Sequence, residues 1–166
     1  MDRFGTFEQF ASFLESNQVR CNIDRNLRIV ELTVNAPPLP GSIYVKWETQ
    51  FPVFTFIQIM IENIPPERVS DLETAIVRLN TVAEVGGFSY DHSRNRIFCR
   101  LSVPVFPQEP ISANAFDQVF KMVVMQARGF VPIFQKVIDG AKGSDIEKIT
   151  AEYAAQLKAQ GGAPAQ

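Results

Sequence analysis

The segment GGFSYDHSRNRIFCRL, residues 86–101, holds the only histidine of the chain and one of its two cysteines. A histidine beside a thiol or a carboxylate can act as a general base or as a metal ligand. Either role for His92 needs a second histidine, or thiolates and carboxylates at ligand spacing. The chain has no second histidine, and Asp, Ser and Asn surround this one. These residue types form hydrogen bonds to the backbone in turns, so the sequence predicts a turn here and not an active site.

The two cysteines, Cys21 and Cys99, each alternate with apolar neighbours along the chain. A nucleophilic cysteine needs a basic, partly exposed setting and a nearby base, whereas a core-facing thiol behaves as a small hydrophobe. We expect both cysteines to face the core. Gly86-Gly87 lacks the Lys-Ser/Thr of a phosphate-binding loop, and no motif places a carboxylate pair. The sequence therefore predicts a protein that is not an enzyme, with no catalytic residues, no cofactor and no metal.

Arg96, Phe98 and Arg100 alternate along the segment that follows the turn, so they share one face of a predicted strand. Arginines around an aromatic ring can bind single-stranded nucleic acid through phosphate contacts and base stacking. The same pattern is typical of a solvated face that protects a strand edge. The formal net charge is −2 and the isoelectric point about 5.5, which does not favour nucleic acid. Nucleic-acid binding is therefore the alternative hypothesis and not the leading one.

A long third helix, predicted from a cap at Ser112 to about Asp139, is apolar on two faces. The broader face is expected to pack on the core. On the opposite side Met122, Met125 and Ile133 recur at helical spacing. This second face must be covered either by the terminal helix of the same chain or by another chain, and the sequence leaves both possibilities open. Because methionines suit adaptable contact surfaces, these three residues are candidates for partner binding.

The segment VFTFIQIMI, residues 53–61, differs from the other predicted strands because both of its faces are largely apolar. Such a strand is either covered on both sides or part of an interface. We expect Phe54 and Phe56 to lie on the outer face of the sheet, where they would contribute to partner binding.

Local signals predict the elements that position these residues. Thr6 caps a first helix, prolines 65–66 open a second one, and glycines 86–87 are expected to end it. Alternating apolar residues predict four strands before the second helix and a hairpin after it. The predicted order is α-β-β-β-β-α-β-β-α plus a short C-terminal helix. This is an α+β fold with helices packed on a mainly antiparallel sheet.

The chain has 166 residues, of which 46% are hydrophobic, enough for one domain with a buried core. We expect residues 1–143 to form that domain, 144–159 a terminal helix and 160–166 a disordered tail. The N-terminus does not resemble a signal peptide, and the apolar stretches are shorter than a membrane span requires. Two cysteines do not make a disulfide framework. The expected location is the cytoplasm, without a membrane.

The segment LNTVAEVGGFSYDHSRNRIFCRLSVPV, between an amphipathic helix and a long phenylalanine-rich one, resembles the YbjN family of proposed sensory transduction regulators. In that family a helix carrying an asparagine ends near a glycine, and a Phe-x-x-Asp hairpin returns as an apolar strand. The matching positions here are Asn80, Gly87, Phe88 and Asp91. The early FEQFASFLESNQVRCNI also matches, and the resemblance spans about residues 4–140.

The resemblance implies the fold of type III secretion chaperones, small α+β proteins that often dimerise and hold extended segments of partner proteins. It implies no catalytic residues. The leading hypothesis from the sequence is therefore a non-enzymatic protein-interaction module, a regulator or chaperone-like protein. It would act as a homodimer that binds another protein.

Overall fold

A computed structural model describes residues 3–48, 50–81, 83 and 86–161. A six-stranded sheet forms its centre, with the strand order β2-β3-β4-β5-β7-β6 and every neighbouring pair antiparallel. The six strands are β2 (Cys21–Asp24), β3 (Ile29–Thr33), β4 (Ser42–Glu48), β5 (Val53–Glu62), β6 (Gly87–Asp91) and β7 (Arg96–Pro104). A separate pair joins β1 (Arg3–Phe4) to β8 (Ile111–Ser112), which was not predicted. The predicted α+β class with a mainly antiparallel sheet is confirmed.

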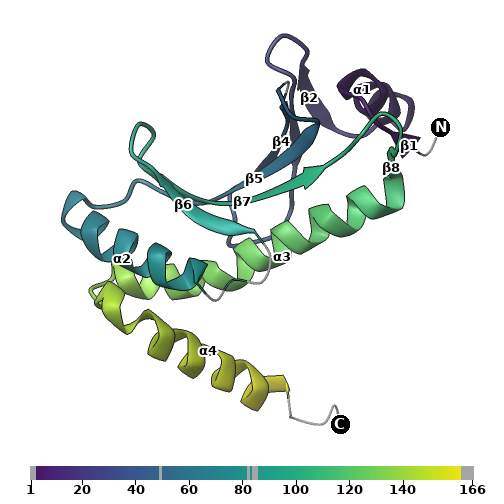
Figure 1. Cartoon of the computed structure of the whole chain (residues 1–166). Coiled ribbons are helices and arrows are strands. Elements are labelled where there is room, and N and C mark those ends of the chain that lie inside the picture. Colours follow the sequence, from purple (N-terminus) through teal and green to yellow (C-terminus); the bar gives the residue numbers. More distant parts are fainter. Residues whose placement is uncertain (1–2, 49, 82, 84–85, 162–166) are drawn as a thin grey trace.

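The helices gather on one side of this sheet (Figure 1). They are α1 (Phe7–Ser16), α2 (Val69–Asn80), α3 (Ala113–Ile138) and α4 (Ile146–Gly161), with short 3-10 helices η1 (Pro66–Arg68) and η2 (Gly143–Asp145) before α2 and α4. The long α3 runs beneath the sheet, and α4 turns back below α3. No helix within the described ranges is long and apolar enough to cross a membrane. The predicted tail began at residue 160, but α4 continues through residue 161. Residues 162–166 lie outside the described residues.

The predicted starts of the first and third helices are confirmed by capping hydrogen bonds. The Thr6 hydroxyl accepts a hydrogen bond from the Gln9 amide at 3.3 Å, and the Ser112 hydroxyl accepts one from the Ala115 amide at 3.1 Å. Each cap satisfies a backbone donor that has no partner inside its helix. The observed α1 and α3 therefore begin where the sequence places them.

The predicted end of the second helix is wrong, because α2 ends at Asn80 and not at the two glycines. The Asn80 side chain accepts from the Phe88 amide at 2.8 Å and donates to the Phe88 carbonyl at 2.9 Å. Gly86 instead serves the entrance to β6: its φ is +66°, and a Cβ there would lie 2.7 Å from the Arg100 carbonyl oxygen. Glycine is needed at this position for the turn and the close approach, not to end a helix.

The core between sheet and helices is centred on aromatic rings. Phe54 of β5 packs against Phe10, Trp47 and Phe116, with ring centroids 5.0, 4.6 and 5.9 Å away. Phe54 is 1% exposed, and Phe56, which packs on Phe116, is fully buried. The prediction that Phe54 and Phe56 lie on the outer sheet face is therefore wrong. Both faces of this strand are apolar, so alternation alone did not show which face α1 and α3 cover.

Ile133 is also wrongly predicted as a contact residue, because it is only 3% exposed. It belongs to the same buried cluster as Ile146 and Ile149 of α4, and α4 packs on both α2 and α3. The two possibilities left open for the second face of α3 therefore apply to different parts of the helix. Its C-terminal part is covered within the fold, whereas the part around Met122 and Met125 is exposed.

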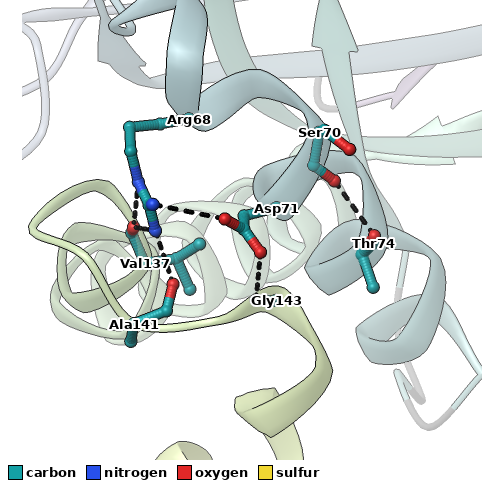
Figure 2. A network of polar contacts seen from close by, with 7 residues as sticks. All are labelled: Arg68, Ser70, Asp71, Thr74, Val137, Ala141 and Gly143. Atoms are coloured by element: carbon teal, nitrogen blue, oxygen red, sulfur yellow. Dashed lines mark hydrogen bonds and ion pairs between the residues drawn. The ribbon is translucent and has the colours of Figure 1, made fainter.

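A polar network holds the α3–α4 connection against α2 (Figure 2). The Arg68 guanidinium donates to the carbonyls of Val137 and Ala141 at the end of α3 and lies 3.2 Å from the Asp71 carboxylate. The Gly143 amide donates to the other Asp71 oxygen at 3.0 Å. Helix C-termini leave carbonyls without intrahelical partners. Arg68 therefore stabilises the end of α3, while Asp71 fixes the start of η2 and with it the direction of α4.

Candidate functional site

The face of the sheet opposite the helices carries its own apolar strip. Val45 and Phe56 pair across β4 and β5 and are buried in the core, so Tyr44 and Ile57, which pair one residue along, point to the opposite face. The apolar side chains of this open face are Ile29, Tyr44, Val53, Ile57, Ile59 and Phe98. They lie apart from the contiguous core. We call these six residues the open-face strip.

Two hollows lie over this strip. The first has a volume of about 280 Å³, with Ile29, Tyr44 and Ile57 in its lining and the turn residues Leu27 and Arg94 at its sides. The second has a volume of about 630 Å³, and its lining residues are Glu48, Gln50, Phe51, Val53, Thr55, Arg100 and Ser102. The two adjoin on β5, because Thr55 and Ile57 are two residues apart on the same face. We call the two hollows together the sheet trough.

The β7 side of the trough is rich in arginine. The Nε atom of Arg96 lies 3.4 Å from the Asp91 carboxylate. Neither Arg94 nor Arg100 has a carboxylate within ion-pair distance among the residues that the structure describes. Positive charge is therefore concentrated on the β7 side of the trough, whereas Asp24 and Glu31 lie on the opposite side of the first hollow.

On the other side of the trough the acidic groups are engaged within the fold. The Tyr44 hydroxyl donates to the Glu31 carboxylate at 3.2 Å. Burial, with Glu31 beside it, raises the pKa of Tyr44, so this hydroxyl remains a hydrogen-bond donor at neutral pH. The Asp24 carboxylate accepts from the Leu27 amide at 2.9 Å, which closes the β2–β3 turn. The trough can therefore bind an apolar segment on its floor and anionic groups along β7.

The predicted site residues lie in three places. Arg96, Phe98 and Arg100 do share the open face of β7, beside the strip. Met122 and Met125 lie on the outside of α3, away from the sheet, and are 43% and 72% exposed. The remaining three, Phe54, Phe56 and Ile133, are core residues as described above.

Sequence reasoning missed the aliphatic part of the strip, Ile29, Ile57 and Ile59. A signal for it was present, since Ile43, Val45 and Trp47 alternate with polar residues, which indicates that they face inward, and Trp47 pairs with Phe54 across β4 and β5. Paired residues of an antiparallel ladder share a face. The alignment of these two strands would have placed Phe54 inward and Ile57 outward.

The His92 segment is a turn, as predicted. The Asp91 carboxylate accepts from the Ser93 hydroxyl and from the amides of Ser93 and Arg94, and the Ser93 hydroxyl contributes most to lowering the pKa of Asp91. His92 is exposed, and its Nε2 lies 2.9 Å from a carboxylate oxygen of Glu73 on α2. The residue therefore links the hairpin to α2.

Cys99 is buried as expected, and burial raises the pKa of its thiol to about 12. At neutral pH it is protonated and not nucleophilic. Cys21 is half-buried and packs against the core. Among the described residues, no three histidine, cysteine, aspartate or glutamate side chains are grouped so that they could hold a metal ion.

Comparison with solved structures identifies the fold. The chain is similar to YbjN, a proposed transcription regulator from E. coli, with a TM-score of 0.54 and 11% identity over 76% of this chain and 88% of that one. It is also similar to a chain of the HopA1–SchA chaperone–effector complex, with a TM-score of 0.52 and 12% identity over 76% of this chain and 94% of that one. No family model and no curated protein matches the sequence. The expected fold, that of YbjN and of the type III secretion chaperones, is thus confirmed.

Proposed function

We propose that this protein is a non-enzymatic protein-interaction module of the cytoplasm, which holds a segment of a partner protein in the sheet trough. The observation that carries the proposal is the open-face strip, an apolar surface on which no described helix packs, and all of its residues except the buried Ile59 are partly exposed. Exposed apolar patches of this kind mark interaction sites in soluble proteins. A chain with the same fold in a chaperone–effector complex gives further support.

Site-specific photo-crosslinking in cells tests the proposed function. A photoreactive benzoylphenylalanine placed at position 57, on the floor of the trough, is expected to form adducts with another polypeptide. The same group at position 77 serves as the control, because Val77 is 66% exposed on α2 and away from the sheet. Mass spectrometry of the adducts identifies the partner. Equal adducts at both positions, or none at position 57, would show that the trough does not hold a partner.

We further propose that the protein works as a homodimer and that Met122 and Met125 lie at the contact. Both side chains are exposed on one side of α3. Nearby Gly129 would admit a Cβ without meeting any atom within 4 Å, so the helix surface is open there. Flexible, polarizable methionine side chains adapt to a facing surface.

The double change Met122→Glu with Met125→Glu is expected to convert the dimer to a monomer, because two carboxylates would be buried against apolar groups of the second copy. Sedimentation equilibrium measures the result. The matched control is Ser12→Glu with Ser16→Glu, which adds the same charge at exposed positions of α1. A wild-type protein that sediments as a monomer, or a double variant that remains a dimer, would remove this surface from the proposal.

Single-stranded nucleic acid is the second candidate ligand, and the observation that favours it is the row of Arg96, Phe98 and Arg100 on the open face of β7. Contacts to phosphates release counterions, so such binding weakens steeply as salt is added. A salt titration with an RNA oligomer measures this. Absence of binding at low salt would dispose of the candidate.

A further inference from the structure

We infer that the segment held in the sheet trough is an extended peptide in which apolar side chains are flanked by carboxylates. The apolar groups would lie on Ile29, Tyr44 and Ile57, and the carboxylates beside Arg94 and Arg100. This inference rests on the proposed function and adds the chemistry of the partner to it.

The shape of the trough suits an extended chain. Its floor follows β5 from Val53 to Ile57 and continues between the two turns that carry Leu27 and Arg94. Arg96 and Arg100 are four residues apart on β7, which is about 13 Å along a strand. An extended peptide has the same rise per residue, so carboxylates about four residues apart would reach both ends of this arginine row.

The charges on the β7 side of the trough favour an anionic partner there. Lys46 is matched by Glu48 at 3.0 Å, and Glu31 is engaged by Tyr44. Arg94 and Arg100 have no such match among the described residues, as shown above. A carboxylate of the bound segment would supply the missing ion-pair partner. Charge-assisted hydrogen bonds to arginine are among the stronger polar contacts.

Arg96 gives an independent indication. Its Nε atom is buried but makes no hydrogen bond of good geometry within the described part of the chain, although it lies 3.4 Å from Asp91. Buried donors are normally satisfied. Arg96 also lines the first hollow, so an additional acceptor in the trough could draw this side chain into a fully bonded position.

A nucleic acid suits the same arginines less well. A nucleic acid carries a phosphate at every nucleotide, so some phosphates would approach Asp24 and Glu31 on the opposite side of the first hollow and be repelled. A peptide can carry its carboxylates on the β7 side alone. Nucleic-acid platforms stack bases on aromatic rings, whereas four of the six residues of the open-face strip are aliphatic. The lining therefore favours an acidic and apolar peptide.

The test is a two-dimensional NMR titration of the full-length protein with a defined probe, the capped heptapeptide Asp-Glu-Leu-Ser-Val-Glu-Asp, in which the two glutamates are four residues apart. Three controls are a peptide with lysine at each acidic position, a peptide with serine at each apolar position, and a nine-nucleotide oligo-uridine. The protein variant is Arg94→Glu with Arg100→Glu. Its matched control is Arg20→Glu with Arg128→Glu, which makes the same change of charge at exposed arginines outside the trough.

The expected result is that the acidic peptide shifts the amide signals around Ile57 and Arg100 and binds at least tenfold more tightly than either control peptide. The trough variant should lose at least tenfold in affinity, and the Arg20/Arg128 variant should bind as the wild type does. The inference is overturned if no shifts occur at about 1 mM peptide, the weak end of specific binding. It is also overturned if the lysine peptide or the oligo-uridine binds better. Photo-adducts to a polypeptide at position 57 would in either case leave the proposed function standing.

Discussion

Replacing Gly143 by alanine is expected to lower the free energy of unfolding by about 3 kcal/mol, the upper end of the range for overpacking. Gly143 is buried where η2 meets α2, and a Cβ built there would overlap the Asp71 carbonyl oxygen and lie 3.0 Å from the Thr74 side chain. Backbone atoms of a packed helix cannot move aside locally. The substitution must therefore displace η2, break the Gly143–Asp71 hydrogen bond and loosen α4. Urea-induced unfolding measures the loss.

Gly129→Ala is the matched control, because a Cβ at this exposed position of α3 meets no atom within 4 Å. Alanine is the better helix former by about 1 kcal/mol, so this variant should be as stable as the wild type or more so. A Gly143→Ala protein with wild-type stability would mean that η2 is not held against α2 as described.

Phe54→Ala is expected to cost about 3–5 kcal/mol of stability, as for other buried phenylalanines. The ring touches Phe4, Phe10, Trp47 and Phe116 in the centre of the core, so its removal leaves a cavity lined by aromatic rings. The thermal unfolding midpoint should fall accordingly.

Phe51→Ala provides the comparison for Phe54, since Phe51 lies three residues earlier and is 70% exposed. Its loss should change stability by no more than about 0.5 kcal/mol. If the two variants were equally stable, Phe54 would be a surface residue after all, as the apolar pattern of its strand alone had suggested.

Much of the fold could be predicted because its signals are local. Thr6 and Ser112 cap helices with their own side chains, and the Asp91–Asn95 segment closes a hairpin through hydrogen bonds between near neighbours. The alternation of Ile43, Val45 and Trp47 with polar residues matches the buried face of β4.

The failures concern contacts made over long sequence distances. Nothing within residues 53–61 indicates that α1 and α3 cover the face of Phe54, which only its pairing with Trp47 shows. Nothing near Ile133 indicates that Ile146 and Ile149 lie in the same cluster. The end of α2 was misplaced because Asn80 bonds to Phe88, eight residues along, across a connection that the local pattern does not define. The candidate site was affected most, since the position of a surface depends on what covers the opposite side.

The Asn80 side chain also limits how this sheet can assemble. β6 is the last strand at its end of the sheet, and such an edge is a template for strands of other molecules. At Phe88 the amide and carbonyl that an incoming strand would use are already bonded to Asn80. A carboxamide thus replaces one residue of a seventh strand, which protects the protein from edge-to-edge polymerisation at β6.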